Sequence, residues 1–121
     1  MKSTFMEKQF NTFLDALNNE TRIKMLKIIC ENSMHISQIA RELNVSVPVV
    51  SKHAAILEDA NLISRKVFGK SHVLSVKDKN VLSNTVYYND MVYNEREKYS
   101  NIRISEDYSK VYSTIQRLMS A

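Results

Sequence analysis

The chain has 121 residues, of which 44% are hydrophobic and 25% are charged, and its net charge is +4. This length is enough for one domain with a modest core. No apolar run approaches the roughly 18 residues of a membrane helix, and MKSTFMEKQF lacks the continuous apolar stretch of a signal peptide. We therefore expect a cytoplasmic globular protein that does not enter a membrane.

Two amphipathic helices are predicted at the start of the chain. TFME, which begins at Thr4, has the form of a capping box, and apolar residues then recur at helical spacing as far as Leu17. A second helix should cover about Asn19 to Glu31. Its inner face includes Cys30, the single cysteine. We interpret Cys30 as a small core residue, and the alternative is a redox or metal-sensing thiol.

The next segment, ISQIARELN, predicts a short helix. Ser37 is the expected N-cap, and the helix should run through Leu43. Asn44 then stands where a left-handed residue ends many helices, and asparagine is the commonest choice there after glycine.

A second helix should follow after a turn of only a few residues, in VSVPVVSKHAAILED. Ser46 is its expected N-cap, and Pro48 lies in the first turn, where its missing N–H loses no hydrogen bond. The helix should end at about Asp59, and Asn61 provides a second left-handed stop.

The two faces of this second helix differ in character. Val50, Ala54 and Leu57 share one side and can face a core. The opposite side carries small or neutral residues and one cation: Val47, Pro48, Ser51, Lys52 and Ala55. Small side chains near the N-terminus suit a helix that must approach base edges in a major groove.

From Arg65 the hydrophobic period changes to two, which predicts a β-hairpin with arms at 65–68 and 72–76 and a turn at Gly69-Lys70-Ser71. Residues 64–77 hold four cations and no acid; the cations are Arg65, Lys66, Lys70 and Lys77. Such a patch fits contact with a polyanion, and a solvated surface strand is an equal alternative.

The remainder predicts a helix over residues 79–98, a polar break, and a last helix that opens at Ser105. All six tyrosines follow residue 86. Tyrosine covers apolar area and keeps a polar tip, so we expect a dimer interface here. An aromatic-lined pocket for an unidentified effector is the alternative.

Two helices, a tight turn and a basic hairpin make a winged helix-turn-helix. Four segments resemble the ArsR family of winged-helix repressors: NETRIKMLKII, ISQIARELNVS, VPVVSKHAAILEDANLI and RKVFGKSHVLSV. The resemblance covers about residues 10–80. The stretch from Ser46 to His53 is its most specific part.

The resemblance implies a homodimeric transcription regulator that binds double-stranded DNA, and repression is the expected effect. It implies a single domain, mostly α with a small β-hairpin, with a DNA-binding core at about 19–77 and dimerisation helices at about 4–17 and 79–120. The expected DNA contacts are Ser46, Val47, Pro48, Ser51, Lys52, His53, Arg65, Lys66 and Lys70.

Some positions depart from the family. Val47 stands where a polar base reader is frequent. The ligands of the metal-sensing members are missing, because His35 and Ser37 replace a cysteine pair and Asp78 is the one match to a second site. We therefore expect no metal and no cofactor. An unidentified small-molecule or protein effector remains a candidate partner.

The three histidines, at positions 35, 53 and 72, are scattered. His35 is expected on the surface or at a cap, and His53 either packs or contacts a phosphate. His72 is either structural or contacts the DNA backbone. No grouping of nucleophile, base and acid supports an enzyme. The alternative function is a winged-helix protein-interaction module acting on the transcription machinery.

Overall fold

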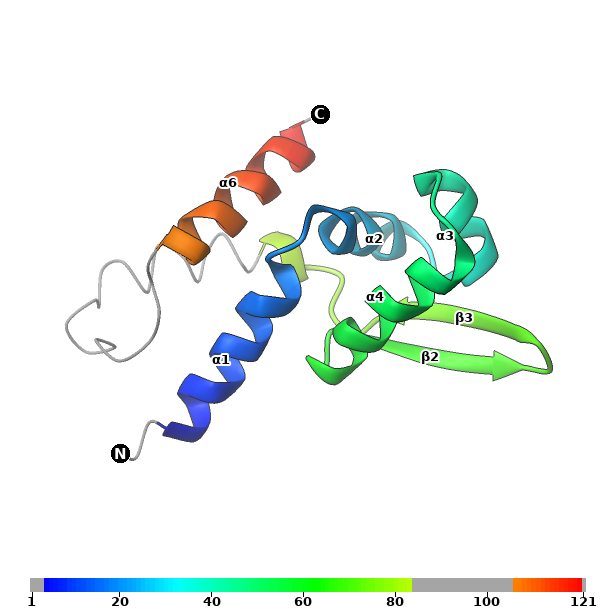
Figure 1. The fold of residues 1–121 in the computed structure, drawn as a ribbon, viewed down its shortest axis with the longest axis horizontal. Helices are drawn as coiled ribbons and strands as arrows, with labels where there is room; N and C mark the ends of the chain where they lie inside the picture. Colours follow the sequence, from blue (N-terminus) through cyan, green and yellow to red (C-terminus); the bar gives the residue numbers. More distant parts are fainter. Residues whose placement is uncertain (1–3, 84–105, 121) are drawn as a thin grey trace.

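The computed structural model describes residues 4–83 and 106–120. Its elements, in chain order, are α1 (Thr4–Leu17), α2 (Glu20–Glu31), β1 (Met34–His35), α3 (Ile36–Leu43), α4 (Val47–Asp59), β2 (Ile63–Phe68), β3 (Ser71–Val76) and α6 (Glu106–Ser120). The fold is mostly helical with a small antiparallel sheet, which confirms the expected winged helix-turn-helix (Figure 1).

One core joins the helices to the sheet. α2, α3 and α4 all contribute side chains that are fully buried, among them Leu26, Ile39 and Leu57, and the sheet contributes Leu74. The predicted inner face of α4 is confirmed, since Val50, Ala54 and Leu57 are each 0% exposed. Burial of a Leu, Ile or Val side chain contributes about 1.5–3 kcal/mol, so this face holds α4 firmly in place.

The turns around α4 follow the predicted backbone chemistry. Ser46 caps the helix by accepting a hydrogen bond from the Val49 N–H at 3.4 Å. Asn44 and Asn61 both have left-handed backbones, with φ of 55° and 64°. The backbone N–H of the residue after each asparagine donates a hydrogen bond to the carbonyl oxygen five residues before it, and the N···O distance is 3.0 Å in both cases. These paired bonds satisfy the last carbonyls of α3 and α4 in the Schellman manner.

The sequence analysis predicted Ser37 as the N-cap of α3, and this prediction is wrong. The helix begins at Ile36, and His35 occupies the capping position without a side-chain hydrogen bond. The reason is β1, a two-residue strand that the sequence analysis missed. His35 pairs with Val73 of β3, which keeps the backbone extended up to residue 35, and the helix starts directly afterwards.

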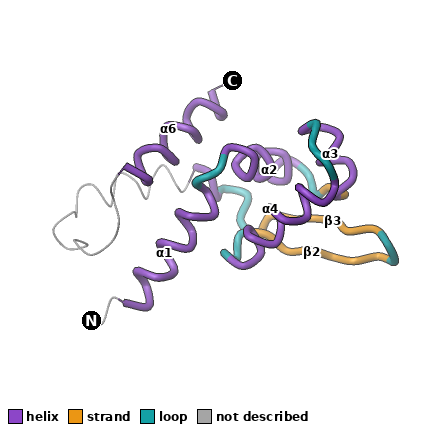
Figure 2. The backbone as a smooth tube through the Cα atoms, in the orientation of Figure 1, coloured by secondary structure: helices purple, strands orange, loops and turns teal. Residues whose placement is uncertain are grey.

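The wing is longer than predicted at both ends. β2 starts at Ile63, opposite Val76 of β3. Ser71 pairs with Phe68 and so belongs to a strand, which reduces the predicted three-residue turn to Gly69-Lys70. Gly69 has φ of +60°, and glycine at the first position of a two-residue hairpin turn favours the twist of the flanking strands. The strand order is β1-β3-β2, and Figure 2 shows β2 and β3 as the two long arms of the hairpin.

α1 and α6 lie on one side of α2, and the β2–β3 hairpin extends on the other (Figure 1). Val111 and Ile115 of α6 are buried in the same core as α2. Arg117 pairs with Glu20 at 2.9 Å, and Lys27 donates to the Leu118 carbonyl. Of the helix predicted over residues 79–98, residues 79–80 form a turn, residues 81–83 are helical, and residues 84–98 lie outside the described residues.

Candidate nucleic-acid interface

The N-terminal half of α4 presents small side chains to solvent on its outer face. Val47 is 46% exposed and Val49 is 40% exposed. Pro48 and Lys52 are exposed, and Ser51 is half-buried. The predicted outer residues are therefore accessible, and Val49 joins them although the sequence analysis did not place it there. A face of this kind can approach base edges closely and can meet thymine methyl groups.

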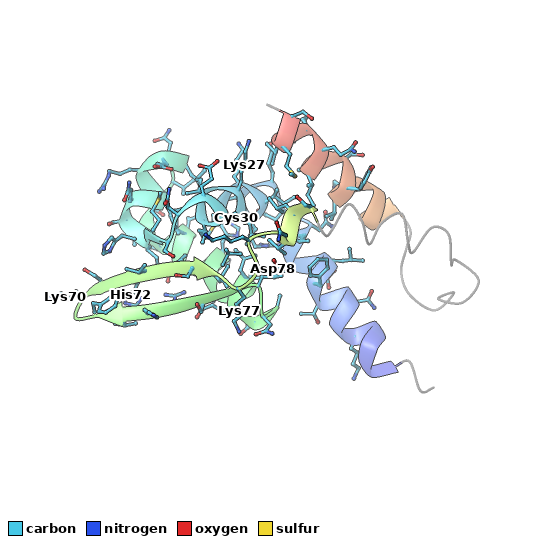
Figure 3. The ribbon with its side chains drawn as sticks, turned by 180° about the vertical axis from the view of Figure 1, so that it is seen from behind. Lys27, Cys30, Lys70, His72, Lys77 and Asp78 are labelled. Atoms are coloured by element: carbon cyan, nitrogen blue, oxygen red, sulfur yellow. The ribbon has the colours of Figure 1, made fainter. Side chains whose placement is uncertain are left out.

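A polar groove of about 290 Å³ separates this face from the wing. It is lined by residues of β1, the start of α3, α4, the wing turn and the start of β3: His35, Ile36, Ser37, Val47, Ser51, Lys70, Ser71 and His72. Lys70 and His72 lie toward the free end of the hairpin (Figure 3). Hydroxyls, imidazoles and one ammonium are groups that can hydrogen-bond a phosphate.

The free end of the wing combines charge with apolar surface. Lys66 and Lys70 are exposed. Between them, Val67 is 57% exposed and Phe68 is 63% exposed. Lys77, the fourth predicted cation, lies at the base of the hairpin and donates to the Asn61 side chain (Figure 3). Lys66 and Lys70 are thus the exposed cations of the outer part of the wing.

Arg65 is held within the protein. Its Nε and Nη2 donate to one oxygen of Glu58 in α4, at 3.0 and 2.7 Å. Its Nη1 lies 3.4 Å from the Ser51 hydroxyl and 3.2 Å from His72 Nδ1. The predicted DNA contact at Arg65 therefore sits in an intramolecular network that also engages Ser51.

His53 also faces a partner inside the chain. Its Nδ1 lies 3.1 Å from Nη1 of Arg22 in α2. Because a guanidinium can only donate, Nδ1 must accept, which places the ring proton on Nε2. Arg22 also donates to the carbonyls of Ala16 and Asp15 at the end of α1. Arg22 therefore connects the end of α1 to α4 through His53.

The environment of His53 favours its neutral form. Burial is the main cause that lowers its pKa, and the positive charges of Arg22 and Lys52 lower it further. The folded pKa thus lies below the unfolded value of about 6.5. Between the two values the unfolded chain binds more protons, so stability rises with pH.

We expect the contribution of His53 to stability to be complete above about pH 6.5 and to be lost as pH falls through the folded pKa. His53→Gln keeps an acceptor for Arg22 but cannot be protonated, so it should flatten this part of the pH profile. Urea unfolding of both proteins between pH 5 and 8, our chosen range, checks the expectation. The matched control is His35→Gln, which changes an exposed histidine. A profile that H53Q leaves unchanged would refute the assignment.

The other side chains that could bind a metal ion are dispersed over the described part of the protein. His35 is exposed, and His72 is half-buried beside Arg65. Cys30 is half-buried against the core, and burial, followed by the carboxylates of Asp78 and Glu31, raises the pKa of its thiol. A raised pKa disfavours the reactive thiolate. Among residues 4–83 and 106–120, no three His, Cys, Asp or Glu side chains gather as a metal site would require.

The fold and the accessible face of α4 define a winged helix-turn-helix protein. Residues 19–65 match the family described as bacterial regulatory protein, arsR family. An uncharacterized HTH-type transcriptional regulator of Methanocaldococcus jannaschii is 43% identical over 49 residues, which are 40% of this chain and 52% of that protein. The matching segment thus spans about half the length of the curated relative. The match over residues 19–65 confirms the resemblance to the ArsR family.

Solved structures support the fold. HlyU from Vibrio cholerae N16961 superposes with a TM-score of 0.56 at 18% identity, over 77% of this chain and 94% of that one. NolR from Sinorhizobium fredii superposes with a TM-score of 0.60 at 19% identity, over 81% of this chain and 91% of that one. A crystal structure of an ArsR family transcriptional regulator superposes with a TM-score of 0.60 at 19% identity, over 73% of this chain and 97% of that one. The matched family is described as one of bacterial regulatory proteins and the curated relative as a transcriptional regulator, and neither description is that of an enzyme.

Residues 4–83 and 106–120 contain no helix long and apolar enough to cross a membrane.

Proposed function

We propose that this protein is a sequence-specific regulator of transcription that binds double-stranded DNA as a homodimer and represses the promoter it occupies. One observation carries the proposal: the small, accessible face of α4 stands beside a wing whose segment 64–77 holds cations and no acid. The first feature suits insertion into a major groove, and the second suits the flanking phosphates.

Each predicted contact has a role in this proposal. Val47 and Pro48 meet base edges or thymine methyls, and Ser51 and Lys52 supply hydrogen-bond donors to bases or phosphates. Ser46, beyond capping α4, lies at the end that approaches the duplex. The wing cations Lys66 and Lys70 neutralise phosphates. His53 and Arg65, which the sequence analysis included, act through Arg22 and Glu58 in this proposal and do not touch DNA themselves.

Titration of fluorescent promoter DNA with the purified protein tests the proposal. We expect binding to weaken as salt rises, because released counterions oppose association. Unrelated DNA of the same length should bind more weakly at every salt concentration. Equal affinity for both duplexes at all salts would contradict sequence-specific binding and would favour the protein-interaction alternative.

We expect a dimer in solution that uses α1 and α6. Val111 and Ile115 of α6 are buried within their own chain, but Met119 stays 45% exposed next to half-buried Leu118. Exposed apolar surface of this kind often marks an interface. The tyrosines at 87, 88, 93 and 99 lie outside the described residues.

Multi-angle light scattering measures the dimer directly. A mass near twice the 14.0 kDa chain is expected at tens of micromolar, a concentration we choose. Met119→Glu should shift the equilibrium toward monomer, because it places a charge on that surface, whereas Lys110→Gln on the same helix should not. A monomer for the unaltered protein at this concentration would rule out the proposed assembly.

A further inference from the structure

We propose that Glu58 and Arg65 form a clamp that fixes the wing relative to α4, and that Arg65 serves DNA binding through this position and not by contacting a phosphate. The inference rests on the proposed function, because a clamp of this kind matters only if α4 and the wing engage one duplex. It implies that Glu58 favours the binding of a polyanion although its own side chain is acidic.

The geometry of the ion pair is the first support. Two guanidinium nitrogens of Arg65 donate to the same Glu58 oxygen, at 3.0 and 2.7 Å. The Arg65 side chain is 16% exposed and that of Glu58 is 31% exposed. A charge pair that is largely shielded from water is stronger than a surface pair. Turning Arg65 toward DNA would leave Glu58 half-buried beside DNA phosphates without its counter-charge.

The remaining guanidinium nitrogen extends the clamp. Nη1 lies within hydrogen-bond reach of the Ser51 hydroxyl and His72 Nδ1. The guanidinium is planar and its donors form a rigid fork. A single side chain of β2 thus reaches two residues of α4 and one of β3, and all three of its nitrogens have partners inside the protein.

The clamp lies where it can set the direction of the outer part of the hairpin. Arg65 pairs in register with Leu74, the buried residue of β3. Beyond this level β2 continues into Lys66, Val67 and Phe68, which are all exposed. The inner half of the hairpin is therefore anchored to the core, and at its outer limit Arg65 ties β2 to α4. The angle set there determines whether Lys66 and Lys70 meet the duplex that α4 enters.

A pair of neighbouring acids provides the test. Glu58→Gln and Asp59→Asn each remove one negative charge from the end of α4, and Asp59 is exposed. Electrostatics alone predicts that both variants bind DNA as well as or better than the unaltered protein. The clamp predicts that E58Q alone weakens specific binding, on the order of tenfold, while D59N does not.

Two charge-conserving variants distinguish a positioning role of Arg65 from a direct contact between Arg65 and a phosphate. Arg65→Lys keeps the positive charge, but one ammonium cannot reproduce the planar fork. Lys24→Arg keeps the charge at an exposed position of α2, outside the proposed interface. The clamp predicts weaker binding for R65K and unchanged binding for K24R. A phosphate contact at Arg65 predicts instead that R65K binds nearly normally, which would overturn the inference.

A mutant cycle completes the design. If the clamp acts through the wing, E58Q should cost little more affinity once Lys66 and Lys70 are both glutamine. An equal loss in both backgrounds would show general damage to the fold and contradict the clamp. Circular dichroism at the binding temperature checks that each variant is folded. Absence of selective binding by the unaltered protein defeats the proposed function, whereas E58Q behaving like D59N defeats the clamp alone.

Discussion

Replacement of Val47 by glutamate should abolish specific DNA binding while the fold is kept or slightly stabilised. Val47 is the first residue of α4 and is 46% exposed. A negative charge in the first turn of a helix is favourable by about 0.3–1 kcal/mol. The same carboxylate would face the negatively charged duplex, and juxtaposed like charges cost several kcal/mol. We expect an affinity loss on the order of a hundredfold or more.

Two measurements on the same sample check this expectation. Thermal unfolding should give a midpoint equal to or above that of the unaltered protein, and DNA titration should show no specific complex. Lys24→Gln is the matched control, because it lowers the net charge by the same amount at an exposed position of α2. Normal binding by V47E would mean that the start of α4 does not enter the groove.

Neutralising Lys66 and Lys70 together should weaken binding to all DNA sequences alike. Each phosphate contact contributes about 0.9 to the slope of log affinity against log salt. The double variant K66Q/K70Q should therefore lower that slope by about two and should weaken binding by roughly tenfold at moderate salt. Its preference for the specific site over unrelated DNA should change little, since phosphates carry no sequence information.

The control for this variant is Lys24→Gln with Lys110→Gln, which removes the same charge from exposed positions of α2 and α6. It should leave the salt slope nearly unchanged, because neither residue lies in the proposed interface. A K66Q/K70Q protein with an altered sequence preference and an unaltered slope would show that the wing does not act on phosphates.

Local rules accounted for the helix-turn-helix and for much of the wing. The caps and stops around α4 are set by neighbouring residues, so Ser46, Asn44 and Asn61 could be assigned from the sequence. The inner face of α4 followed from helical spacing. β1 escaped prediction because two residues show no period, and its extended backbone depends on pairing with β3, which is about 40 residues distant.

The side chains of the interface were harder to predict, because long polar residues choose partners that are remote in sequence. Arg65 was expected to contact DNA, and His53 was expected either to pack or to contact a phosphate; in the structure their side chains lie against Glu58 and Arg22, respectively. The i, i+7 spacing of Glu58 and Arg65 crosses from a helix into a strand, so no helical or strand pattern relates them. The cation-rich, acid-free segment was the useful signal for Lys66 and Lys70.

Selection of bound sites from random duplex DNA, followed by hydroxyl-radical footprinting of the selected sequence, tests the central claim most directly. A dimer that inserts two copies of α4 should enrich a sequence with two-fold symmetry. Its half-sites should lie about one helical turn apart, or a multiple of that spacing, with wing protection on the flanking backbone. V47E should enrich nothing. Recovery of unrelated sequences by the unaltered protein, with no protected half-sites, would contradict the account.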